Sequence, residues 1–167
     1  YGSPGVGTVH HLAMEMFKKQ AGVDIVHIPY KGAALITPDL ISGQIPMAIM
    51  SVNATVPQVK GGKIRAIAIS SPVKLAVADW PAIGETLPGF DAASTRLLMA
   101  PAGVPREVVV RLSDGLRRML ASEDIQRAFT AQGSHWQFIS PEDLAASMRT
   151  DIFKWSAAAR EAGVKPE

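Results

Sequence analysis

Residues 1–32 read YGSPGVGTVHHLAMEMFKKQAGVDIVHIPYKG, and this stretch decides the fold. A glycine-rich turn, Gly2–Thr8, runs into apolar residues spaced three and four apart, which is the period of an amphipathic helix. Ala21-Gly22 supplies the end of that helix, and the short β-branched segment Asp24–Ile28 leads into Pro29-Tyr30-Lys31-Gly32. The stretch therefore predicts a loop, a helix, a strand and a second loop.

The same alternation continues to residue 70. A second helix is predicted with Thr37 as N-cap, Pro38 as its first residue and Gly43 as its end, and the turn before it can also be helical. A strand is predicted at 47–51, a helix at 54–60 and a strand at 64–70. Helices that alternate with strands favour parallel strands joined by crossovers. We predict an α/β fold with an open parallel or mixed sheet.

The remainder of the chain changes character at Pro101–Pro105. Before that boundary we expect an ordered surface excursion over 71–92 and one more strand over 93–100. After it the pattern predicts three helices, opening at Pro105, Ser122 and Ser140, with apolar faces that need a partner surface. The chain therefore divides into an α/β part, residues 1–103, and a helical segment, residues 104–167.

Composition excludes several classes of function. The 17 basic and 15 acidic residues are scattered, so a net charge of +2 does not indicate a nucleic-acid partner. The chain has no Cys, which excludes disulfides, thiolate catalysis and zinc sites made of Cys. No apolar run reaches the length of a membrane span.

The turn Gly2–Thr8 places a flexible backbone directly before a helix N-terminus. The unpaired N–H groups and the positive dipole end of a helix can bind an anion. Alternatively, Ser3 or Thr8 only caps the helix and the glycines only form the turn. The turn is not a dinucleotide fingerprint, because His10 stands where the third glycine is required, and it lacks the Gly-Lys-Ser/Thr of a Walker motif.

The other candidate residues indicate binding groups without a reacting group. His10 and His11 are adjacent and point to different sides of a helix, so no metal site is predicted. Pro29–Ala33 follows a strand, where open parallel sheets collect ligands, and we expect Tyr30 to form a pocket wall and Lys31 to face solvent. No nucleophile, pair of catalytic acids or cofactor motif is present, so we predict that the protein is not an enzyme.

Four segments, in order over nearly the whole chain, resemble the Bug or TctC-like solute-binding proteins of tripartite tricarboxylate transporters. They are GSPGVGTVHHL, HIPYKGAALITPDLISGQI, VKGGKIRAIAIS and WPAIGETLPGFDAASTRLLMAPAGVP. Thr8 stands where the family often has Ser, and Pro46 stands where an Asp is common. Thr8 keeps the hydroxyl, and Pro46 should shorten or shift the start of the strand that follows and says little about the choice of ligand.

The resemblance implies a periplasmic binding protein of type II, in which two α/β lobes close over a small carboxylate without catalysis. Its ligands would be di- or tricarboxylates, acidic amino acids or aromatic acids, and its partners membrane permease subunits. With Gly7 and Thr8 as first choices, the ligand-binding residues it implies are Ser3, Gly5, Val6, Gly7, Thr8, His11, Pro29, Tyr30, Gly32 and Ala33. No catalytic residue, metal or cofactor is implied.

The resemblance also gives the two parts of the chain a role. Residues 1–103 correspond to the second lobe, which carries half of the ligand cleft, and residues 104–167 correspond to helices that complete the first lobe, so that lobe's sheet would precede Tyr1. We therefore expect weak ligand binding, with self-association, packing of the helices on their own lobe, or partial mobility. The alternative function is a ligand-sensing or interaction module that regulates a partner protein.

Overall fold

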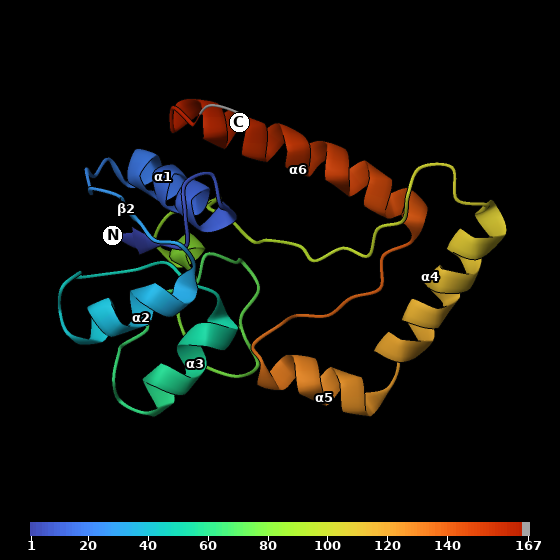
Figure 1. Cartoon of the computed structure of the whole chain (residues 1–167), viewed down its shortest axis with the longest axis horizontal. Coiled ribbons are helices and arrows are strands. Elements are labelled where there is room, and N and C mark those ends of the chain that lie inside the picture. Colours follow the sequence, from blue (N-terminus) through green and yellow to red (C-terminus); the bar gives the residue numbers. More distant parts are fainter. Residues whose placement is uncertain (165–167) are drawn as a thin grey trace.

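The computed structural model describes residues 1–164, which form a small parallel sheet, six α-helices and one 3-10 turn (Figure 1). The elements are β1 (Gly2–Ser3), α1 (Val9–Ala21), β2 (Ile28–Pro29), α2 (Ala33–Ile41), α3 (Val52–Lys60), η1 (Ile83–Glu85), α4 (Arg106–Leu120), α5 (Glu123–Ala131) and α6 (Pro141–Glu161). The predicted α/β class is therefore observed. The last three residues of the predicted helical segment, 165–167, lie outside the described residues.

The sheet is centred on β1. Gly2 pairs with Ile28 and Ser3 with Pro29, and both pairings are parallel. On the other side of β1, the N–H of Gly2 donates to the carbonyl of Met47 and the N–H of Ile49 donates to the carbonyl of Gly2, each over 3.0 Å. Residue 2 has little room for a side chain, because a Cβ there would lie 2.7 Å from Cδ1 of Ile45.

The predicted strands are longer than those observed. The strand expected at 24–28 begins only at Ile28, and those expected at 47–51 and 64–70 are reduced to single bridges at Ala48 and Ile69. The strand predicted over 93–100 is wrong, since this segment forms no strand within residues 1–164 and Ser94–Ala100 is exposed. Local sequence can favour an extended chain, but a strand also requires a hydrogen-bonding neighbour.

The N-cap predicted for the second helix is wrong, whereas the alternative, that the turn before Thr37 is also helical, is confirmed. Helix α2 begins at Ala33 after Gly32, so Thr37 is inside it and is not its N-cap. Pro38 lies within the helix, where it removes one backbone donor without ending the helix. The other predicted helices form near their expected positions, and Ser140 caps α6 by accepting a hydrogen bond from the N–H of Asp143 over 3.1 Å.

The hydrophobic core lies where α1, the excursion 71–92 and α6 meet. Ala13, Phe90 and Ala92 form its buried centre, with partly buried Trp155 of α6 packed against them. Phe17 meets Phe90 edge to face, with ring centroids 6.5 Å apart. Phe90 is therefore the anchor that attaches an otherwise irregular segment to the helices.

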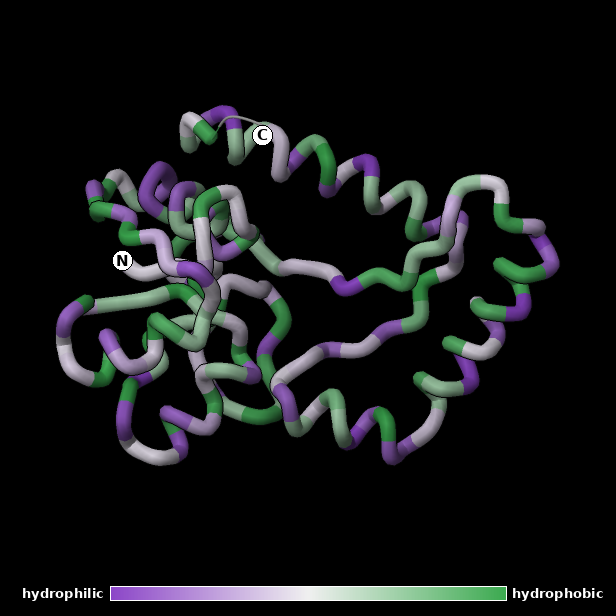
Figure 2. Tube along the Cα trace, viewed as in Figure 1, coloured by the Kyte–Doolittle hydropathy of each residue, from purple (hydrophilic) through white to green (hydrophobic). Residues whose placement is uncertain are grey.

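Helices α4 and α5 lie away from this core (Figure 1). Neither helix has a buried residue, and the apolar side chains of Val108, Leu112 and Met119 are 40, 46 and 41% exposed. Figure 2 shows hydrophobic and hydrophilic residues alternating around α4. Within residues 1–164, no helix is both long enough and apolar enough to cross a bilayer.

Candidate functional site

The loop from Ser3 to Thr8, which we call the glycine loop, leaves β1 and enters α1. Its conformation depends on Gly7, whose φ of 73° is in the left-handed region. Thr8 is the N-cap: its hydroxyl donates to the carbonyl of Gly5 over 2.8 Å and accepts from the N–H of His11 over 3.3 Å. Of the two predicted capping residues, Thr8 caps the helix and Ser3 does not.

Two of the residues expected to hold a ligand are used inside the glycine loop. The N–H of Gly7 donates to Nδ1 of His11 over 3.1 Å, and the Thr8 hydroxyl makes the two capping bonds. Within residues 1–164, no hydrogen bond is made by the backbone N–H groups of Val6, Thr8 and Val9. These donors, at the start of α1, remain open to an anion.

Behind the glycine loop lies a stack of three rings. His27 stacks on His11, with centroids 4.1 Å apart, and on Tyr1, with centroids 4.8 Å apart. The hydroxyl of Ser3, which is fully buried, lies 2.6 Å from Nε2 of His27. No local sequence pattern connects His27 with the glycine loop, but its position just before Ile28, which pairs with Gly2, places it beside β1.

Charged groups surround this stack on one side. The Tyr1 hydroxyl donates to the carboxylate of Glu15 over 2.8 Å, and the ammonium group of Lys18 lies 3.0 Å from the same carboxylate. Burial lowers the pKa of His11 and that of His27, and for His27 the neighbouring His11 lowers it further. Both imidazoles are therefore neutral near pH 7, and the stack carries no net charge.

The second predicted loop, Pro29–Ala33, runs alongside the glycine loop. The N–H of Tyr30 donates to the carbonyl of Ser3 over 2.9 Å, and the N–H of Gly32 donates to the carbonyl of Pro4 over 3.1 Å. Ala33 is the first residue of α2, so both loops enter helix N-termini at the same edge of the sheet. The structure thus brings the two predicted loops together.

The side chains of the second loop differ in their roles. The Tyr30 hydroxyl donates to Asp39 over 2.7 Å, and this hydrogen bond raises the pKa of the phenol. Pro29 is exposed on β2, and Lys31 is exposed, as predicted. Val6 and Gly7 of the glycine loop are exposed as well. The accessible surface at this edge therefore consists mainly of backbone and small side chains.

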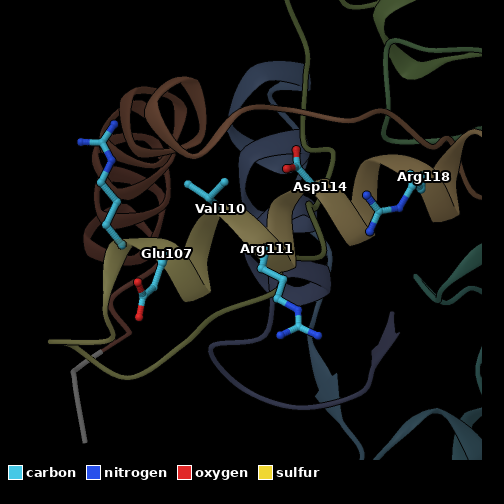
Figure 3. A pocket seen from close by; sticks show the side chains of 6 residues that line it. Glu107, Val110, Arg111, Asp114 and Arg118 are labelled. Atoms are coloured by element: carbon cyan, nitrogen blue, oxygen red, sulfur yellow. The ribbon is translucent and has the colours of Figure 1, made fainter.

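The remaining candidates do not form a second site with this one. His10 lies 3.3 Å from the Ser51 hydroxyl, on a different side of α1 from His11. The part of the chain that the structure describes contains no group of three His, Asp or Glu side chains able to hold a metal ion. A shallow hollow along α4, lined by residues that include Glu107, Arg111 and Arg118, is formed by one helix and mixes both charges (Figure 3).

Comparison with known proteins places this geometry in a family. The family described as the tripartite tricarboxylate transporter family receptor matches residues 1–164. Protein BugT of Bordetella pertussis is 30% identical over 162 residues, which are 96% of this chain and 50% of BugT. The chain therefore spans about half the length of BugT, as it does of other curated relatives it matches.

Solved structures agree with this match. A structure of R. palustris Rpa4515 with adipate has a TM-score of 0.88 and 31% identity, covering 100% of this chain and 56% of that chain. The periplasmic binding protein BugD gives a TM-score of 0.78 at 27% identity, with 99% of this chain and 57% of BugD covered. MatC from Rhodopseudomonas palustris with bound malate gives 0.73 at 25% identity, with 94 and 55% covered.

These findings bear on three predictions. The predicted fold class is confirmed, since the neighbouring structures are periplasmic binding proteins that share this α/β arrangement. The family consists of transporter receptors and not enzymes, which confirms the prediction that the chain is not an enzyme, and a solute-binding role is supported. With a family match that spans residues 1–164, the chain belongs to the TctC family of tripartite tricarboxylate transporter receptors.

Proposed function

We propose that residues 1–103 supply one wall of a site that binds a small carboxylate, in a periplasmic receptor that delivers its solute to membrane permease subunits. The observation that carries this proposal is the adjacency of the glycine loop and Pro29–Ala33, each leading into a helix N-terminus. Adipate and malate, the ligands named for two similar structures, are both dicarboxylates and support this ligand class.

Binding would rest on backbone donors and not on side-chain charge. The open N–H groups of Val6, Thr8 and Val9 provide hydrogen bonds to a carboxylate, and the dipole of α1 favours a negative charge at this end. Exposed Lys31 makes no necessary contact in this scheme. The process is capture and closure, with no bond made or broken.

The helical segment has a separate part in this proposal. Residues 104–164 would support the opposite wall of the cleft, because α4 and α5 have no buried residue, whereas α6 packs on the lobe that holds the glycine loop. One wall holds a carboxylate less tightly than two, so we expect this chain to bind in the millimolar range, about 4 kcal/mol. Specificity among carboxylates would then depend mainly on groups outside the glycine loop.

The experiment is a titration of the chain with adipate, malate, citrate and glutamate, followed by amide chemical shifts in NMR spectra. We expect the amides of Val6, Thr8, Val9 and Gly32 to move together with at least one of these acids. If none of the four acids moves these amides at millimolar concentration, the proposal is wrong.

A proline substitution tests the backbone donors directly. Val9→Pro removes one open N–H at the first position of α1, where proline is tolerated, and Thr8 already has the extended backbone (φ −67°, ψ 156°) that a residue before proline requires. We expect binding to weaken roughly fivefold or more. Glu123→Pro, at the first position of α5 after the equally extended Ser122, is the matched control and should leave binding unchanged.

A further inference from the structure

The hydrogen bond from Gly7 fixes the protonation state of His11. A backbone N–H can only donate, so Nδ1 of His11 must accept, and the imidazole hydrogen lies on Nε2. That nitrogen faces the carboxylate of Glu15, with Nε2 4.0 Å from Oε1. The observed conformation of the glycine loop is therefore one that only a His11 with an unprotonated Nδ1 can support.

His27 does not share this restriction. Its Nε2 meets the Ser3 hydroxyl, which can either donate or accept, so a proton on His27 leaves this 2.6 Å contact intact. A charge on one ring, however, faces the other ring at a centroid distance of 4.1 Å. Two protonated rings at this distance would repel each other, so the stack accepts one proton far more readily than two.

We propose that His11 is a positioning residue for the carboxylate site, and that the glycine loop keeps its binding conformation only while Nδ1 of His11 is free to accept from Gly7. With a proton on Nδ1, the N–H of Gly7 and the Nδ1–H of His11 would face each other as two donors without an acceptor, and the loop would have to rearrange. Gly5 and Gly7, both at positive φ, give the backbone the freedom to do so. This inference concerns the regulation of the proposed site, and only its ligand-binding consequence rests on the proposed function.

The burial and charges around the ring stack lower the pKa of His11, so its neutral form is favoured at neutral pH. Burial lowers the pKa of His11, Glu15 one turn along α1 raises it, and Lys18 lowers it, so that the pKa lies below its ordinary value. The other groups that face the stack are His27 itself, the Tyr1 hydroxyl and the amino group of Tyr1, which donates to the carbonyl of Val26 over 2.6 Å. The glycine loop therefore keeps its conformation at neutral pH and rearranges in acid, when His11 gains a proton on Nδ1.

The test is an NMR titration of the unliganded chain between about pH 7.5 and pH 4.5, which spans the ordinary histidine pKa. The 15N shifts of His11 should show an unprotonated Nδ1 at the upper end. The amide proton of Gly7 should move upfield with the same midpoint as the His11 ring. A protonated Nδ1 at pH 7.5, or a Gly7 amide that does not follow His11, would overturn the proposal without any ligand being present.

Two variants distinguish the role of His11 as a hydrogen-bond acceptor for Gly7 from its role in packing against His27. His11→Asn places an amide oxygen near the position of Nδ1 and cannot titrate, so we expect the Gly7 amide shift to lose its dependence on pH in this range. His11→Phe keeps a ring on His27 but has no acceptor, and we expect binding to fall roughly fivefold at neutral pH. His10→Asn is the control, because His10 contacts Ser51 and not the loop.

The outcomes distinguish this inference from the proposed function. If the Gly7 amide follows His11 but no carboxylate binds, the positioning device stands and the function fails. If a carboxylate binds equally well to His11→Phe and to the native chain, the function stands and the positioning role fails. Should His11→Phe not fold, the titration of the native chain still decides the question.

Discussion

The buried hydroxyl of Ser3 lies 2.6 Å from Nε2 of His27, and this contact ties the start of the glycine loop to the chain that enters β2. Only two residue pairs join β1 to β2, so backbone pairing alone is a weak connection. The contact between Ser3 and His27 and the stack of Tyr1, His27 and His11 strengthen this connection between the two strands. The candidate site is therefore built on a short sheet reinforced by histidines.

The free energy of unfolding should depend on pH through these histidines. Burial lowers the pKa of His10, His11 and His27 in the folded protein, so the unfolded chain binds more protons. Their contribution is complete above a pH of about 6.5 and is lost as the pH falls from there toward the folded pKa values. Urea unfolding at a series of pH values should show this decline.

The matching control is a variant with all three histidines replaced by Asn. Its unfolding free energy should change much less between about pH 6.5 and pH 5, because the groups that take up protons on unfolding are gone. A native chain that becomes more stable as the pH falls through this range would contradict the assignment of neutral, buried imidazoles.

Gly7→Ala should weaken both stability and binding. Residue 7 has a φ of 73°, and an alanine there costs about 1 kcal/mol or more. Gly22→Ala is the matched control, because Gly22 has a φ of 66° at the end of α1, where a Cβ has open space. Chemical unfolding should show similar losses for both, whereas carboxylate titration should show weakened binding for Gly7→Ala alone. Equal binding by the two variants would argue against a role for the glycine loop.

Gly2→Ala should destabilise the protein by overpacking. The added Cβ would lie 2.7 Å from Ile45 and 3.2 Å from the ring of Tyr30, which costs about 1–3 kcal/mol. Gly115→Ala, inside α4 and with nothing within 4 Å of the new atom, should instead stabilise the chain by about 0.5–1 kcal/mol. Urea midpoints measure both changes, and a loss of stability in Gly115→Ala would show that α4 packs more tightly than the structure indicates.

The exposed face of α4 should promote association. We expect the chain to bind an apolar dye and to sediment faster as its concentration rises, since Val108 and Leu112 are 40 and 46% exposed. Replacing both with Gln should reduce both effects and change stability by about 0.5 kcal/mol at most. Val26→Gln, at a 76% exposed position away from α4, is the control. A monomer that binds no dye would contradict the expectation.

Local pattern predicted the helices well and the strands poorly. The glycine after Ala21, the cap at Ser140 and the three and four spacing mark helix ends and faces by short-range rules, so α1, α4, α5 and α6 lie near their expected positions. Strand length, in contrast, depends on a neighbour distant in sequence. That is why the segment 93–100, which lacks such a neighbour, forms no strand.

The sequence by itself determined the two loops and the helices that they enter, because glycine, proline and capping residues act within a few residues of themselves. Only the tertiary structure decided which groups the loops leave open. The N–H of Gly7 is taken by His11, and His27, 16 positions further along the chain, completes the stack behind the loop. Such a partnership depends on the parallel pairing of β1 with β2, which no local pattern specifies.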